Sequence, residues 1–117
     1  MNISEVSREK DISADTIRYY ERIGLIPPVK RTSGGIRDFD EEDMRWIDFA
    51  KCMRSAGLSI ESLIEYIKLY GEGERTNLAR KNLLMEESEK LEAKMNELSA
   101  AHTRLKMKIE HYDELLK

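Results

Sequence analysis

The sequence predicts a mainly α-helical protein, in which a small first domain with a β-hairpin is followed by one long helix. Apolar residues recur at helical spacing in several short runs before residue 70, and glycine and proline separate these runs. Residues 76–117 contain no glycine or proline and are rich in Glu, Lys and Leu, which is typical of a long helix. We therefore expect a domain over residues 1–70, a linker over 71–75 and a helix over 76–117.

Two short helices are expected at the start of the first domain. The first begins near Ser4, which is its predicted N-cap. Ser13 caps the second, which covers residues 14–23 and ends at Gly24, because glycine readily adopts the left-handed conformation of a helix end. Pro27–Pro28 then prevent the helix from resuming. Two helices joined by three or four residues form a helix-turn-helix.

The segment after the second helix has the pattern of a β-hairpin. Turn-forming residues occupy positions 33–35, and the residues on either side can alternate between two faces. A hairpin of about ten residues is therefore expected within 29–39. Val29, Ile36 and Phe39 are predicted to anchor it to the core.

Two more helices complete the first domain. Asp40 is expected to cap a helix that runs to about Ala56, with an acidic first turn that suits the positive end of the helix dipole. Ser59 caps a fourth helix, and the glycines within residues 71–73 end it. Thr76 is predicted to cap the final helix.

The final helix has an apolar seam along its length. The seam residues alternate steps of four and three, which is a heptad pattern sustained over more than four heptads. At about 1.5 Å per residue such a helix is roughly 63 Å long, more than a small domain can cover. A second copy of the chain is the simplest partner, so a homodimer is expected. The predicted dimerisation residues are Leu84, Leu91, Met95, Leu98, His102, Leu105, Ile109, Tyr112 and Leu116, with Ser88 as a polar seam position.

Charge is distributed unevenly along the chain. The net charge of −3 argues against nucleic acid when taken alone, but five cations and a single anion lie from Arg18 to Arg37. Phosphate binding requires positive potential at the contact surface rather than over the whole molecule. On the second helix Arg18 and Arg22 share a face beside Tyr19, where they could grip guanine or phosphate. The alternative is a solvated face with a salt bridge to a neighbouring acid.

Residues 16–28 make this interpretation specific. They are Thr-Ile-Arg-Tyr-Tyr-Glu-Arg-Ile-Gly-Leu-Ile-Pro-Pro, which closely resembles the signature of the MerR family, the mercury-resistance regulators. The resemblance extends through Lys30–Arg37 and Gly57–Ile60. It implies a winged helix-turn-helix DNA-binding domain followed by an antiparallel coiled-coil dimer. It also implies promoter activation. In this mechanism the −35 and −10 elements are too far apart for RNA polymerase, and the dimer bends and untwists the DNA between them so that the polymerase can use the promoter.

The resemblance further implies roles for individual residues. Residues 13–22 correspond to the recognition helix, the hairpin to a wing on flanking phosphates, and residues 57–59 to a second wing. The partner is double-stranded promoter DNA. The DNA-binding residues carried over by position are Ser13, Thr16, Arg18, Tyr19, Tyr20, Arg22, Lys30, Arg31, Gly35 and Arg37.

Cys52 is the only cysteine, so no intramolecular disulfide can form, which fits a reducing cytoplasm. Its neighbours Lys51 and Arg54 would favour the thiolate, although a lone helical cysteine is equally often a small buried hydrophobe. The string Phe49–Ser59 is similar to the aldehyde- and thiol-stress-responsive subgroup of MerR regulators. That similarity implies that Cys52 senses electrophiles.

Other classes have weaker support. No metal and no cofactor are expected, because His102 and His111 are nine positions apart and no cysteine lies near the long helix. No apolar run could span a membrane, and no phosphate loop or activated nucleophile indicates an enzyme. Because the sequence stops at Lys117, no appended ligand domain is expected. The remaining alternatives are a MerR-type repressor or activator with another effector, an architectural DNA-binding protein without a dimer rod, and a coiled-coil interaction module.

Overall fold

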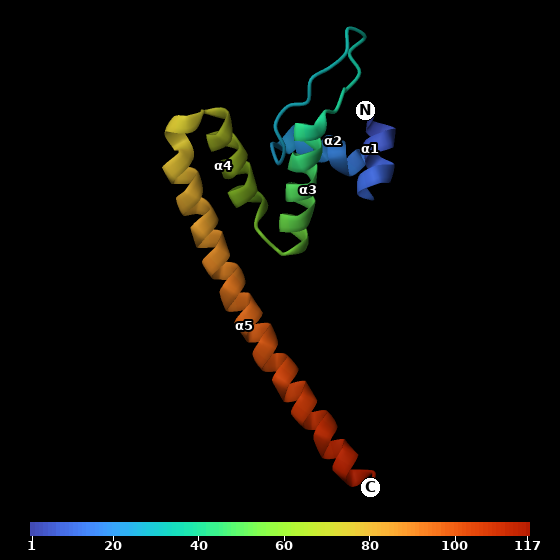
Figure 1. Ribbon diagram of the computed structural model, residues 1–117, viewed down its shortest axis with the longest axis vertical. Helices are drawn as coiled ribbons and strands as arrows, with labels where there is room; N and C mark the ends of the chain where they lie inside the picture. Colours follow the sequence, from blue (N-terminus) through green and yellow to red (C-terminus); the bar gives the residue numbers. More distant parts are fainter. The chain divides into compact units, whose positions relative to one another are not determined.

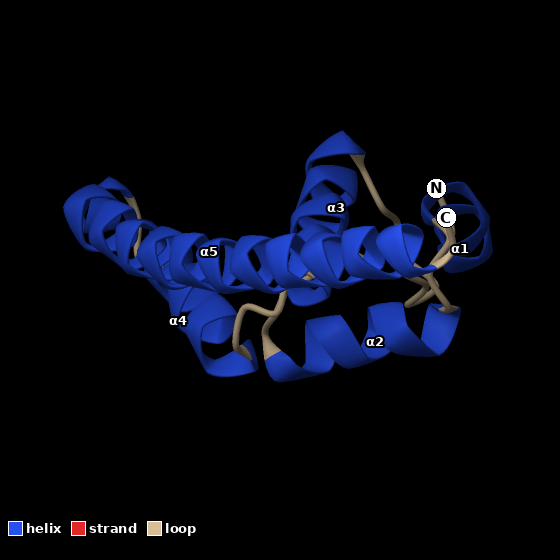
Figure 2. Cartoon of the chain, turned by 90° about the horizontal axis from the view of Figure 1, so that it is seen from below, coloured by secondary structure: helices blue, strands red, loops and turns tan.

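The computed structural model describes residues 1–117 and is built from α-helices (Figure 1). No segment forms a β-strand (Figure 2). The mainly helical class is therefore confirmed. The elements in chain order are α1 (Ile3–Lys10), α2 (Ala14–Ile23), α3 (Glu41–Ser55), α4 (Ile60–Gly71), a 3₁₀ turn (Glu74–Thr76) and α5 (Asn77–Leu115).

The chain divides into two compact units, Met1–Leu83 and Leu84–Lys117. Helix α5 is continuous, so it begins in the first unit and ends in the second. No helix, including α5, is both long enough and apolar enough to cross a lipid bilayer.

Side-chain caps define the helix starts in the first unit. Ser13, Asp40 and Ser59 each accept a hydrogen bond from the backbone amide three residues further on, and they begin α2, α3 and α4 as predicted. Gly24 ends α2 at φ +86°, in the left-handed conformation that favours glycine. These boundaries were predictable because each depends on one local hydrogen bond or one residue type.

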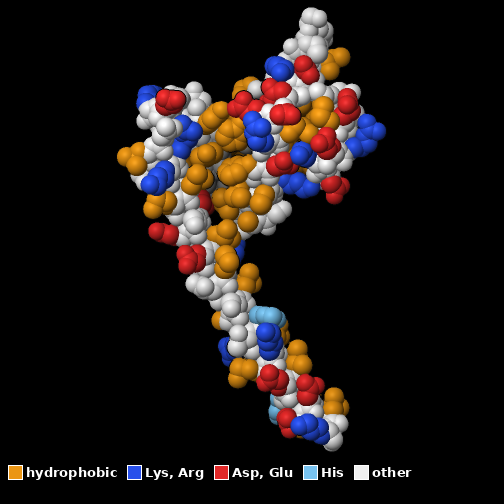
Figure 3. Space-filling view, in the orientation of Figure 1, with side chains coloured by type: hydrophobic (Ala, Val, Ile, Leu, Met, Phe, Trp, Pro, Cys, Tyr) orange, Lys and Arg blue, Asp and Glu red, His pale blue; other side chains and the backbone are white.

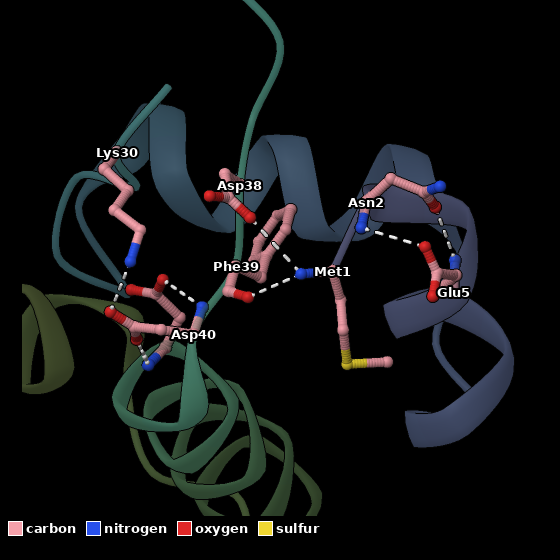
Figure 4. Close-up of polar contacts among 8 residues, drawn as sticks. Met1, Asn2, Glu5, Lys30, Asp38, Phe39 and Asp40 are labelled. Atoms are coloured by element: carbon pink, nitrogen blue, oxygen red, sulfur yellow. Dashed lines mark hydrogen bonds and ion pairs between the residues drawn. The ribbon is translucent and has the colours of Figure 1, made fainter. Parts of the chain in front are cut away.

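Two predicted caps are wrong. Helix α1 is capped by Asn2 rather than Ser4, because Asn2 and Glu5 each accept the other's backbone amide in a capping box (Figure 4). Thr76 does not cap α5. Its hydroxyl oxygen lies 2.7 Å from the carbonyl oxygens of both Leu69, in α4, and Gly73, so it faces the preceding backbone instead.

The predicted hairpin over residues 29–39 is not formed as a pair of strands. The segment has a single antiparallel bridge between Arg31 and Arg37. Pairing does not extend further because the outer amides are used elsewhere. The amide of Val29 donates to a carboxylate on α2, and that of Phe39 donates to the carbonyl of the first residue. We call residues 29–39 the hairpin loop.

The hairpin loop is fixed to the core at its two ends. Val29 and Phe39 are buried, as predicted, but Ile36 is 63% exposed at the tip, so its predicted role as an anchor is wrong. The core beneath is formed by apolar side chains from all four short helices and the loops. Each fully buried aliphatic side chain contributes about 1.5 to 3 kcal/mol. The most deeply buried side chains are Val6, Ile17, Leu25, Ile26 and Ile47.

The seam of α5 is exposed in the isolated chain. Six large apolar residues of the predicted seam have exposed fractions between 58% and 83%; five lie on α5, and Leu116 follows its last residue. Figure 3 shows apolar side chains at intervals along this helix. A helix with such a face requires a partner surface in water. These six residues are Met95, Leu98, Leu105, Ile109, Tyr112 and Leu116.

Candidate nucleic-acid interface

Helix α2 has one buried face and one exposed face. Ile17 and Tyr20 point into the core, which leaves Arg18, Tyr19 and Arg22 exposed on the other side. The guanidinium carbon of Arg22 lies 5.4 Å from the centroid of the Tyr19 ring, in cation–π contact. The sequence correctly predicted that these three side chains share an exposed face.

Arg18 is paired only with its own helix. Its Nη1 donates to Asp15 Oδ1 at 2.9 Å, and both side chains are exposed. Exposed ion pairs of this kind contribute little free energy, so the guanidinium can exchange this partner for a phosphate or a base. The N-terminus of α2 lies one turn earlier, where Ser13 Oγ and Thr16 Oγ1 are 2.7 Å apart.

A groove of about 620 Å³ lies beside α2. Thr16, Tyr19 and Tyr20 line it from α2, and Lys51 and Arg54 line it from α3. Tyr20 is mostly buried, so little of its surface is exposed here. The sequence interpretation linked Lys51 and Arg54 to the cysteine alone and missed the groove. Their spacing of three residues, which places them on one face of α3, was the available signal.

The hairpin loop carries cations beside α2. Lys30 Nζ donates to Asp40 Oδ2 at 3.2 Å, a bond that raises the pKa of the lysine above its ordinary value (Figure 4). Arg31 Nη1 donates to the carbonyl of Gly35 at 2.9 Å across the turn. Gly35 has φ +82° and nothing within 4 Å of the position a Cβ would occupy, so its backbone is open to a close approach.

Glu21 connects α2 to both ends of this loop. Its Oε1 accepts a hydrogen bond from Arg37 Nε at 2.6 Å, and its Oε2 accepts one from the Val29 amide at 2.7 Å. The Glu21 side chain is only 13% exposed. Burial raises the pKa of Glu21, but the bonds from Val29 and Arg37 outweigh it and leave the pKa below its ordinary value. Glu21 therefore stays ionised and holds the loop in place.

Arg37 was predicted as a phosphate ligand, but its Nε is committed to Glu21. The sequence interpretation treated Glu21 only as the single anion in a basic stretch. The available signal was that Glu21 is an isolated acid among cations. It lies eight residues before the hairpin loop begins and sixteen before Arg37, the two places that it binds.

Comparison with known proteins identifies this arrangement. A family model described as MerR HTH family regulatory protein matches residues 1–69. A second model, described as MerR, DNA binding, matches residues 44–107. The chain belongs to the MerR family.

Individual MerR relatives agree with this assignment. The chain is similar to the HTH-type transcriptional regulator AdhR of Bacillus subtilis, with 62% identity over 91 residues that cover 78% of this chain and 65% of that protein. A crystal structure described as a MerR family regulator from Listeria monocytogenes matches at a TM-score of 0.95 and 51% identity, covering 97% of this chain and 86% of the other.

A third MerR protein has been solved together with DNA. HiNmlR, described as a MerR family regulator lacking the sensor domain and bound to promoter DNA, matches at a TM-score of 0.87 and 25% identity. The match covers 97% of this chain and 90% of that one. These likenesses confirm the MerR fold of the chain, with its helix-turn-helix domain and its long C-terminal helix.

Cys52 is exposed on α3, so the alternative that it is a buried hydrophobe is wrong. The cations beside it in sequence serve other groups. Lys51 Nζ donates to the carbonyl oxygens of Lys10 and Asp11, and Arg54 Nη1 donates to that of Leu58. In this MerR chain no three His, Cys, Asp or Glu side chains gather where they could hold a metal ion.

Proposed function

We propose that this MerR protein is a sequence-specific regulator of transcription that binds promoter DNA as a homodimer in the cytoplasm. The main supporting observation is the exposed face of α2, where Arg18, Tyr19 and Arg22 lie on the same helix that holds the hairpin loop. The structural neighbour HiNmlR, solved on promoter DNA, supports the same assignment.

Helix α2 is the element that would enter the major groove, which is wide enough for one helix. Arg18 and Arg22 would donate to guanine edges or phosphates, and the hydroxyl of Tyr19 to a phosphate. Lys30 and Arg31 would contact flanking phosphates from the hairpin loop. The remaining proposed contacts are Ser13, Thr16, Tyr20, Gly35 and Arg37.

The second wing proposed at residues 57–59 gains support from the groove beside α2. Ser59 begins α4, so the helix amides there carry partial positive charge that suits a phosphate. Lys51 and Arg54 lie on the same groove wall. A phosphate strand could therefore pass from the loop across α2 towards the start of α4.

The charge pattern of α5 favours an antiparallel homodimer. Residues 86–97 contain five acids and two lysines, whereas residues 104–108 contain three cations and no acid. A parallel dimer in register would place each segment beside its own copy, with like charges together. An antiparallel dimer brings the acidic segment towards the basic one, which lowers the electrostatic energy.

The seam itself is symmetric about residue 100. If two antiparallel copies cross at residue 100, each seam residue lies opposite a seam residue of the other copy. Each such pair forms one layer of the interface and contains one a position and one d position of the heptad. Ser88 then shares a layer with Tyr112, away from the centre. The proposed pairs are Leu84 with Leu116, Leu91 with Ile109, Met95 with Leu105, Leu98 with His102, and Ser88 with Tyr112.

Such a dimer can act mechanically on a promoter. Two recognition helices held at a fixed separation can bend or untwist the DNA between their half-sites, at a cost of about 1 to 6 kcal/mol that the phosphate contacts offset. The favoured outcome is that RNA polymerase gains access to elements that are otherwise out of register.

The signal is proposed to be an aldehyde or another electrophile that reacts at Cys52. Exposure of the thiol on α3 supports this assignment, because an electrophile can reach it without unfolding the domain. The reacting species is the thiolate, whose sulfur forms a bond to the electrophilic carbon of the aldehyde while the carbonyl oxygen takes a proton from solvent.

The test is transcription in vitro with the DNA upstream of the protein's own gene, with and without an aldehyde, for wild type and Cys52→Ser. We expect protection of two half-sites, affinity that falls steeply with salt, and aldehyde-dependent transcription that only wild type supports. DNA binding that is absent, or indifferent to salt, would refute the DNA-binding proposal. Equal aldehyde responses of the two proteins would refute the role of Cys52 alone.

A further inference from the structure

Tyr70, near the end of α4, is fixed to α3 by both its ring and its hydroxyl. The hydroxyl donates to Glu42 Oε1 at 2.7 Å, and the ring centroid lies 4.7 Å from that of Trp46. The hydrogen bond to Glu42 raises the pKa of Tyr70, so the hydroxyl remains protonated and keeps donating at neutral pH. The end of α4 is thus tied to the first half of α3.

The same tyrosine ring also contacts the start of α5. The guanidinium carbon of Arg80 lies 5.4 Å from its centroid, in cation–π contact. Arg80 Nε donates to Thr76 Oγ1 at 3.0 Å, and that oxygen is 2.7 Å from the Leu69 carbonyl oxygen of α4. Thr76 is only 5% exposed, so this contact is shielded from water.

The backbone between α4 and α5 gives little rigidity of its own. It contains Gly71 and Gly73, and Gly73 has φ +93° with nothing within 4 Å of the position a Cβ would occupy. Glycines allow a wide range of backbone conformations. The side-chain contacts of Tyr70, Arg80 and Thr76 therefore determine how rigidly the start of α5 is attached to α3 and α4.

We propose that Tyr70 is a positioning residue that holds the start of α5 to α3, and that this tie is needed to distort DNA but not to bind it. The inference rests on the function proposed above. The proposed DNA contacts lie on α2, the hairpin loop and the start of α4, and Tyr70 contacts none of them. Distortion, however, requires force to pass from one recognition helix to the other through α5 without the joint yielding.

The experiment compares four single variants, and the double variant Tyr70→Phe/Arg80→Gln, of the full-length dimer on the same promoter duplex. Tyr70→Phe removes the hydroxyl but keeps the ring, and Arg80→Gln removes the cation from that ring. Tyr66→Phe is the matched control for the first, because Tyr66 belongs to the same aromatic cluster. Arg75→Gln is the control for the second, because its ion pair with Glu72 is exposed.

Two quantities are measured, the affinity for the duplex and the end-to-end distance of the bound duplex by energy transfer between its labelled ends. We expect the four single variants and the double variant to bind within about twofold of wild type. Tyr70→Phe and Arg80→Gln should each reduce the distorted fraction about threefold, and the double variant should add little more, because both changes break the same tie. Both control variants should behave as wild type.

Each outcome decides a separate point. The inference would be overturned if Tyr70→Phe distorts the duplex as much as wild type does. It would also be overturned if the variant loses affinity and distortion together, because that result would indicate a general structural role for Tyr70. Wild-type protein that binds DNA without distorting it would instead refute the proposed promoter mechanism.

Discussion

Glu21 illustrates how a single, partly buried carboxylate can organise a cationic surface. It is the only anion from Arg18 to Arg37, and it uses both of its oxygens to hold the two ends of the hairpin loop. Hydrogen bonds to a charged group contribute about 1.5 to 3 kcal/mol each when they are shielded from water. The loop cations therefore keep a fixed position relative to α2 before any DNA is bound.

The variant Glu21→Gln should lose about 1 to 3 kcal/mol of unfolding free energy at pH 7, because the amide cannot replace the charged bond to Arg37. The folded-state pKa of Glu21 is lowered from 4.5, so its stabilisation is complete above that value and disappears as pH falls through the lowered pKa. Denaturant unfolding of both proteins at several pH values measures this effect. The difference between them should shrink below pH 4.5.

Asp15→Asn is the matched control for Glu21→Gln. It also removes a carboxylate that pairs with an arginine from α2, but its side chain is 95% exposed. We expect a change within about 0.5 kcal/mol at either pH. If the two variants lose the same stability, Glu21 has no special role in holding the loop.

The exposed face of α2 was predictable from residue spacing, but the partners of its residues were not. Arg18, Tyr19 and Arg22 follow from helical periodicity, which is a local property. The bond between Glu21 and Arg37 joins residues sixteen positions apart, and no local pattern encodes it. The same limit applied to Cys52, whose exposure depends on which face of α3 the core covers.

At the scale of whole elements, the features that were predicted correctly are those that depend on one continuous segment of the chain. The helices, three of their caps and the glycine that ends α2 follow from local propensity and local hydrogen bonds. The prediction of two hairpin strands was wrong, because the amides of Val29 and Phe39 donate hydrogen bonds to distant groups instead of to each other's strand. Helix α5 was predictable over its whole length because nothing in its composition interrupts it.

The proposed antiparallel pairing of α5 can be tested by exchanging charges. With the crossing at residue 100, Glu92 of one copy lies beside Lys106 of the other, and the symmetry creates this pair twice. Lys106→Glu should weaken the dimer by about tenfold, because it replaces two attractions with two repulsions. Adding Glu92→Lys should restore the wild-type dissociation constant, measured by sedimentation.

Glu110→Lys provides the control for this exchange, because its position faces away from the seam in the same heptad scheme. It should leave the dimer within about twofold of wild type. Failure of Glu92→Lys to rescue Lys106→Glu would show that α5 pairs in another register or orientation.

At the scale of the whole molecule, the proposed dimer makes α5 the connection between two recognition helices. A single domain with one exposed helix could bind one half-site only weakly, because its footprint offers few phosphate contacts. Joining two such domains through paired α5 helices converts the second binding event into an intramolecular one. In the proposed dimer, the paired α5 helices set the separation at which both domains can bind.

The affinity of the dimer should therefore depend strongly on the separation of the two half-sites. Inserting about five base pairs between them, half a helical turn, turns one half-site to the opposite side of the duplex. The affinity of the dimer should fall by roughly 100-fold or more, towards that of a single half-site, because both domains can no longer bind together. Mobility-shift titrations on the natural duplex, the lengthened duplex and a duplex with one half-site scrambled measure this loss. If the lengthened duplex binds as tightly as the natural one, the domains act independently, and a rigid α5 pair cannot be what deforms the promoter.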